Sequence, residues 1–341
     1  MKKYLLISLL IAISTIPLIA KEKEKQPQVK WPEIVESELE IMIKSNEVNN
    51  TYNFNSLKSL FFPARENKVY TVILFTAELE NDISEINKLI KQRYEKAMES
   101  YKKEKEKNPE SEIPEPPPLT FPKEYHHFYM HIYKVSGEKK EFYLKYNAPI
   151  PYDKKETKFY SFGVPLDPGK YVLATEIIRT DYSKLGTSLV SIEIPSFSRL
   201  RDITFSEPLF IRNFEQKVEV ETVFTIHKNS FQIGRILFFP YIVNEFKPNE
   251  SPSLLLQIFG TALDTLNKRY DIDCRLSIRK GKEVITKFKR LSLDRPSLYQ
   301  PIVFKKSKEE FLDPGEYSLF IEIWDRISNR RGKIEIPIKI I

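Results

Sequence analysis

Glycine is scarce in this 341-residue sequence. There are nine glycines, and the two closest, Gly163 and Gly169, are six residues apart. Phosphate-binding P-loops, dinucleotide-binding turns and the nucleophile elbow of hydrolases all place two glycines closer together than that. The sequence therefore excludes these three kinds of site.

Metal-binding residues are scarce as well. The one cysteine, Cys274, lies in an alternating run, where it is expected to be a buried strand residue. Three of the four histidines fall in HHFYMH, a strand pattern that sets His127 and His131 about 13 Å apart, too far to share a metal. Asp271 and Asp273 share a strand face but lack the glycine-containing loop of calcium sites. No metal or cofactor is predicted.

No long block of one charge is present. Basic residues (54) outnumber acidic ones (47), giving a net charge of +7, but the two signs are interspersed along the chain. This pattern favours solubility over nucleic-acid binding. Hydrophobic residues make up 41% of the sequence, which is sufficient for packed cores, and the length suits two domains.

The N-terminus has the order of parts of a secretory signal. Lys2 and Lys3 precede an uncharged apolar run that ends at Ala20, and a charged stretch follows. This order predicts a cleaved signal peptide over residues 1–20 and an exported protein, periplasmic or secreted. The alternative is an uncleaved membrane anchor, which would be the chain's contact with a membrane. No cysteine lies nearby, so a lipoprotein is not expected.

The sequence contains an internal repeat. PLDPGKYVLATEIIR (165–179) matches FLDPGEYSLFIEIWD (311–325) at an offset of 146, and both copies later close with Ile-Glu-Ile-Pro. Upstream, NFNSLKSLFFP (53–63) matches SFQIGRILFFP (230–240) at an offset of 177. We therefore predict two repeated domains, residues 52–198 and 229–341, joined by a connecting segment over 199–228. The first is longer by 177 − 146 = 31 residues, which indicates an insertion.

Alternating apolar residues and turn sequences predict the fold class. Runs such as YVLATEII and YSLFIEIW have a period of two, and Asp-Pro-Gly is typical of turns. The chain is expected to be mainly β, with tandem Ig-like or fibronectin-III-like antiparallel β-sandwiches. Tyr171 and Tyr317, which follow Gly169 and Gly315, are expected to form tyrosine corners and to have structural roles.

Several motifs carry a family resemblance. FQIGRILFFPYIVNEF and LDPGEYSLFIEIWDRISNRRGK are similar to the sandwich regions of exported bacterial GWxTD-domain proteins, and ITFSEPLFI (203–211) resembles the segment that joins such modules. The resemblance covers most of residues 120–341 and rests on fold motifs. The Gly-Trp-x-Thr-Asp signature is absent, because Trp31 follows Lys30 and Trp324 follows Ile323. The resemblance implies an exported protein with Ig-like sandwiches.

The insertion, residues 82–122, combines a helical pattern with a proline-rich stretch. Its apolar residues are spaced as on one face of a helix, and PESEIPEPPPLTFP then favours an extended return. One interpretation packs the helix on its own sandwich; the other makes the insertion a projecting arm that docks on a partner. The candidate docking residues are Ile83, Ile86, Ile90, Tyr94, Ala97, Tyr101, Pro116, Pro117 and Pro118. A second amphipathic stretch, Pro32–Ser45 within the N-terminal segment 21–51, predicts a short helix that covers one end of the first sandwich.

Three functions are compatible with this sequence. The first is an exported, non-catalytic cell-envelope protein that acts as a protein-interaction or structural module, with an envelope protein as its partner. The second is a carbohydrate-binding module, in which rings of EFYLKY and KFYSF stack on sugars; alternatively, these rings fill the core and the interface between the sandwiches. The third is an enzyme of unrecognised type, for which no particular pair of the 47 acids is marked.

Overall fold

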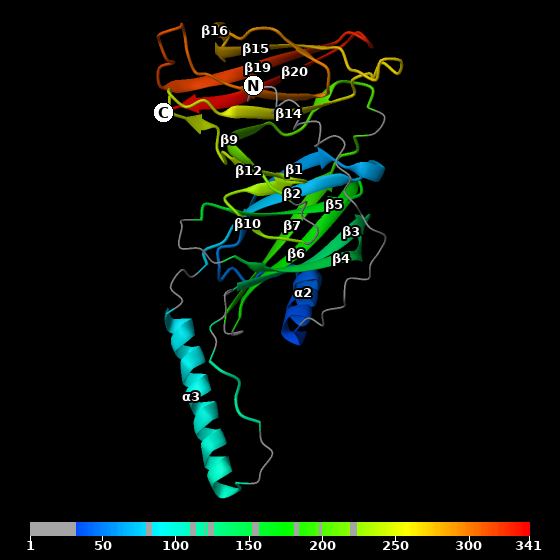
Figure 1. The fold of residues 1–341 in the computed structure, drawn as a ribbon. Helices are drawn as coiled ribbons and strands as arrows, with labels where there is room; N and C mark the ends of the chain where they lie inside the picture. Colours follow the sequence, from blue (N-terminus) through cyan, green and yellow to red (C-terminus); the bar gives the residue numbers. More distant parts are fainter. Residues whose placement is uncertain are drawn as a thin grey trace.

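The computed structural model describes residues 32–79, 84–109, 114–119, 121, 126–151, 157–180, 184–197, 200–218 and 224–341. The predicted fold class is confirmed: the chain is mainly β, with two sandwiches and a helical insertion in the first (Figure 1). The predicted signal peptide lies outside the described residues. Among those described, no helix has the length and apolar character needed to cross a membrane.

The first sandwich consists of two sheets. Sheet 1 has the strand order β4-β3-β6-β7 and sheet 2 the order β1-β2-β5-β10. Aromatic rings fill the space between them: the ring of Phe75 lies 5.6 Å from that of Phe128 and 5.5 Å from that of Tyr160, measured between centroids. The strands are β1 (Asn55–Pro63), β2 (Val69–Thr76), β3 (His126–Ser136), β4 (Lys139–Ile150), β5 (Tyr160–Leu166), β6 (Gly169–Arg179), β7 (Leu185–Ile194) and β10 (His227–Lys228), with a 3-10 turn η1 (Arg65–Asn67).

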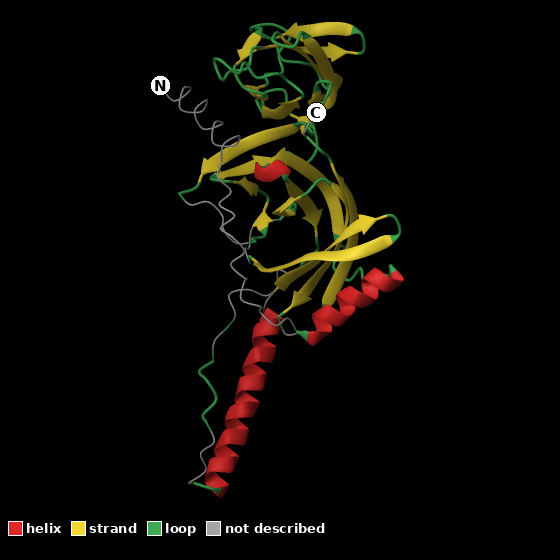
Figure 2. Ribbon diagram, turned by 90° about the vertical axis from the view of Figure 1, so that its right-hand side faces the viewer, coloured by secondary structure: helices red, strands yellow, loops and turns green. Residues whose placement is uncertain are grey.

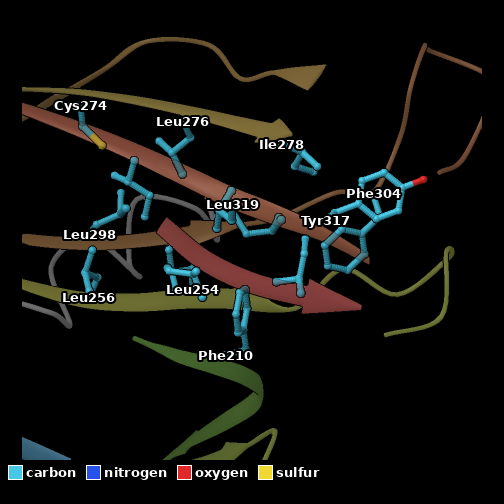
Figure 3. Packing of buried hydrophobic residues seen from close by; sticks show 14 of the residues in the cluster. Phe210, Leu254, Leu256, Cys274, Leu276, Ile278, Leu298, Phe304, Tyr317 and Leu319 are labelled. Carbon is cyan, nitrogen blue, oxygen red and sulfur yellow. The ribbon is translucent and has the colours of Figure 1, made fainter. Parts of the chain in front are cut away.

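The second sandwich repeats this arrangement. Sheet 3 has the order β11-β12-β9-β14-β18, with β8 also on β14, and sheet 4 the order β13-β20-β19-β15-β16, with β17 on β15. Figure 3 shows Cys274, Leu276 and Ile278 of β15 in the core between these sheets. The strands are β8 (Thr204–Phe205), β9 (Leu209–Gln216), β11 (Phe231–Ile233), β12 (Ile236–Pro240), β13 (Glu245–Phe246), β14 (Ser253–Phe259), β15 (Ile272–Lys280), β16 (Glu283–Lys287), β17 (Leu291–Leu293), β18 (Ser297–Pro301), β19 (Gly315–Asp325) and β20 (Arg330–Ile340).

The two sandwiches share a third core, which lies between sheets 2 and 3. Phe62 and Leu74 from sheet 2 are buried there with Phe231 and Phe238 from sheet 3. Strand β2 is therefore covered on both faces, which explains why its sequence VILF is continuously apolar instead of alternating. The four sheets form one continuous stack (Figure 1).

The predicted connecting segment, residues 199–228, contributes strands to both sandwiches. Strand β9 lies between β12 and β14 in sheet 3, and β10 pairs with β5 in sheet 2. Thus β9-β14-β18 in the second sandwich matches β1-β2-β5 in the first, whereas the LFFP strand β12 lies one position further out. The upstream sequence match, 53–63 with 230–240, does not correspond to equivalent places in the sheets. The two LFFP sequences are alike because β1 and β12 both bury apolar side chains in the third core, and a local apolar pattern depends on burial alone.

Both expected tyrosine corners are present. The hydroxyl of Tyr171 donates a hydrogen bond to the carbonyl of Asp167, and that of Tyr317 donates to the carbonyl of Asp313, each at 3.1 Å. Gly169 and Gly315 begin the two strands with φ of 147° and 151°, a region that side chains with a Cβ rarely adopt. The repeated Asp-Pro-Gly-x-Tyr sequence therefore forms the same bonded turn twice.

Helix α2 (Glu33–Ser45) covers the outer face of sheet 1 (Figures 1 and 2). Its apolar side chains Val35, Leu39 and Met42 are buried against β3, β6 and β7. Asn46 ends the helix in the left-handed conformation, and its N–H bonds to the carbonyl of Met42. The predicted helix is therefore present, but it covers a sheet face instead of an end of the sandwich, because its apolar stripe matches an apolar sheet surface.

Candidate functional site

Helix α3 (Ser84–Lys107) extends away from the sandwiches, at the opposite end of the molecule from sheet 4 (Figures 1 and 2). At about 1.5 Å per residue its 24 residues span about 36 Å. None of its described side chains is buried. The interpretation that this helix packs on its own sandwich is therefore wrong, and the insertion has the form of a projecting arm.

The candidate docking residues lie along this arm. Ile90, Tyr94 and Tyr101 are half-buried, whereas Ala97 is exposed. Met98, which is not among the candidate docking residues, is half-buried too; its position four residues after Tyr94 and three before Tyr101 places it on the same stripe. Ile83 lies outside the described residues, as does the side chain of Ile86.

The proline-rich segment runs back alongside α3 in both views (Figures 1 and 2). Pro116 is half-buried, while Pro117 and Pro118 are exposed. Polyproline segments rise about 3.1 Å per residue, so about 12 residues cover the length of the helix. A 24-residue helix and its shorter return are thus matched in length, which explains how the insertion can leave and rejoin the first sandwich.

The two halves of the arm have opposite charge. Helix α3 carries eight basic and five acidic residues, whereas residues 108–122 carry three glutamates and no basic residue. Along the helix, Lys103 donates to Glu99 at 2.7 Å, and this bond holds the pKa of the Glu99 carboxyl below its usual value. The charged groups keep most of the helix surface in solvent. The stripe of Ile90, Tyr94 and Tyr101 is therefore its main apolar surface.

The described residues contain no group of three or more metal-ligating side chains. His131 is buried, and burial lowers its pKa to about 4, so its ring is neutral at pH 7. The Cys274 thiol is buried in the core of the second sandwich, and burial raises its pKa to about 12, so it is not a reactive thiolate. Cys274 has the buried strand position expected from its sequence.

The aromatic runs considered for sugar binding are mostly internal. In KFYSF, Phe159 lies in the third core and Phe162 in the first-sandwich core. In EFYLKY, Tyr146 packs on Phe224 at 4.9 Å between centroids, and Phe142 is 56% exposed. One exposed ring does not make a planar row, so these two runs do not form the strip that a carbohydrate-binding face requires.

Comparison with known proteins assigns no functional site to the chain. No family model matches the chain, so its resemblance to GWxTD-domain proteins stays a prediction. No curated protein matches it either. Among solved structures, Escherichia coli alpha-2-macroglobulin activated by porcine elastase aligns at 11% sequence identity with a TM-score of 0.20, over 64% of this chain and 20% of that protein. At this level the alignment says nothing of function.

Proposed function

We propose that this chain is an exported, non-catalytic protein of the cell envelope that binds a protein partner through its arm. The arm is defined as α3 together with the proline-rich segment around Pro116. The observation that carries this proposal is that α3 projects with a half-buried apolar stripe and no core of its own. Helices in proteins gain most of their stability from tertiary packing of an apolar face, so a projecting amphipathic helix suits a partner surface.

The sandwiches act as the scaffold in this proposal. Three buried cores fix the four sheets relative to one another, and loops held on such a scaffold commonly carry binding residues. Export is supported by the signal-like order of Lys2, Lys3 and the apolar run to Ala20. N-terminal sequencing of the purified protein tests that part: a mature chain that begins at Lys21 is expected, and retention of Met1 contradicts cleavage.

Photo-crosslinking tests the arm. A photoreactive phenylalanine replaces Tyr94 or Tyr101 on the stripe or, as the matched control, Lys96 on the exposed side of the same helix. Defined protein adducts are expected from positions 94 and 101, with several-fold lower yield from 96. Equal yields from all three positions, or none, contradict docking through the stripe.

A further inference from the structure

The outer face of sheet 4 is open, whereas α2 covers the same face of sheet 1. Glu322 in β19 is exposed, although its repeat counterpart Glu176 in β6 is fully buried beneath α2. A shallow hollow of about 430 Å³ lies on the open face. We call this surface the Trp324 face; its lining includes Asp273, Arg275, Glu322, Trp324, Arg331 and Lys333.

The Trp324 face has unpaired positive charge. Arg275, Arg331 and Lys333 are exposed and form no ion pair within the described residues. Asp273 is already paired with Arg290, so Glu322 is the one unpaired acid of this lining. The surface therefore favours a ligand that carries carboxylates.

Aromatic rings lie beside guanidinium groups on this face. The Trp324 indole N–H donates to Asn329 at 3.0 Å, and Arg331 lies 5.4 Å from the indole centroid. Four residues earlier in β19, Phe320 has the Arg279 guanidinium 3.4 Å from its ring centroid, and the buried Nε of Arg279 has no acceptor. The two aromatic–arginine pairs are about 13 Å apart along the strand. Aromatic surfaces with cations suit extended, proline-rich peptides that carry acids.

The chain itself contains such a peptide. The return segment of the arm contains Pro114, Glu115 and Pro116–Pro118, which lie in no helix or strand, and Glu115 is exposed. The sequence places Glu110 and Glu112 shortly before it and no basic residue between 108 and 122. Three acids without a base give this segment the charge that the unpaired cations of the Trp324 face attract.

We propose that the Trp324 face binds the return segment of the arm of a second copy of this chain. Within one copy the contact cannot form, because the arm extends from the first sandwich away from sheet 4 (Figure 1). Each copy offers one arm and one face, so the contact is head-to-tail and does not close on itself. This inference rests on the proposed function and identifies the partner of the arm.

A complementation experiment by analytical ultracentrifugation tests the inference. One variant, armless, has residues 82–122 replaced by a short turn; the other, R331E/K333E, has an altered face. Wild type is expected to form assemblies larger than a dimer as concentration rises, each variant alone to stay monomeric, and their mixture to stop at a dimer. K282E/K308E, which makes the same charge change at exposed lysines elsewhere in the second sandwich, is expected to assemble as wild type does.

Charge exchange gives a second, independent test. E110K/E112K/E115K is expected to lose self-assembly. It is expected to bind R331E/K333E at least tenfold more tightly than it binds wild type. Monomeric wild type at all concentrations, or no recovery in this pair, overturns the inference. If crosslinks from Tyr94 identify another protein while wild type stays monomeric, the proposed function stands and the second-copy assignment fails. If neither crosslinks nor assembly occurs, both fail.

Discussion

Replacement of Glu176 by glutamine should remove most of the pH dependence of stability between pH 6 and 8. Glu176 lies on β6, paired with Tyr129 of β3 and Thr187 of β7, and its side chain is fully buried beneath α2. Neither carboxyl oxygen has a hydrogen-bond partner. Burial raises the pKa of this carboxyl to about 8, and Glu38 of α2 adds to the rise. At pH 7 the folded protein therefore holds Glu176 protonated.

The magnitude follows from proton linkage. The folded pKa of Glu176 is above its unfolded value of 4.5, so its contribution is fully present below pH 4.5 and is lost as pH rises towards 8. Each pH unit well inside that window costs about 1.4 kcal/mol, and because the slope falls near the folded pKa, the loss from pH 6 to 8 is about 2.3 kcal/mol. His131 has the opposite sign: its lowered pKa removes stability as pH falls from 6.5 towards 4. The two effects oppose each other near pH 5–6, and above pH 6.5 Glu176 determines the slope.

Urea unfolding at pH 6, 7 and 8 measures this slope. Wild type should lose about 2–3 kcal/mol of unfolding free energy over that range, whereas Glu176→Gln should lose less than about 1 kcal/mol. The matched control is Glu322→Gln, which makes the same change at the exposed counterpart in β19 and should leave the slope unchanged. If wild type and Glu176→Gln have the same slope, Glu176 is not a buried, protonated group and the reasoning fails.

Three further predictions concern the corners, the third core and the arm. Tyr317→Phe should lower the unfolding free energy by about 1 kcal/mol, because the Asp313 carbonyl loses its donor; a loss below about 0.3 kcal/mol in urea unfolding contradicts that role. Phe231→Ala should cost about 3–5 kcal/mol by leaving a cavity between sheets 2 and 3, and an unchanged melting temperature would be inconsistent with a packed interface. Replacement of residues 82–122 by a short turn should change stability by less than about 1 kcal/mol, since no described side chain of α3 is buried, whereas a large loss by calorimetry argues that α3 packs on the sandwich.

Sequence predicted most reliably where a local pattern has one physical meaning. Asp-Pro-Gly-x-Tyr identified both corners, because the turn, the glycine and the tyrosine hydroxyl act within five residues. The alternating runs identified the sandwiches, and the spacing of Ile90, Tyr94 and Tyr101 identified α3. Each of these features depends on neighbours in the chain.

Features that depend on distant partners were not predictable in the same way. The LFFP motif in β12 looked equivalent to that in β1, but β9 occupies the place beside β14, and strand order is set by long-range pairing. The amphipathic stripe of α3 did not reveal whether it packs or projects, since both need one apolar face. The burial of Glu176 depends on α2, while the identical Glu-Ile sequence at Glu322 is exposed.

The route of the chain between the sheets has a mechanical consequence. After β7 in sheet 1, the chain enters sheet 3 as β8 and β9, returns to sheet 2 as β10, and then re-enters sheet 3 as β11. Two sandwiches joined by a single linker would hinge at that linker. Here the chain crosses repeatedly between the sandwiches, and a packed core lies between them. A pull on the arm would enter through β2 and β3, one strand in each sheet of the first sandwich, and would reach the second sandwich through the third core. The stacked sheets would therefore transmit force as one rigid body, and the chain would extend only when strands separate from a sheet.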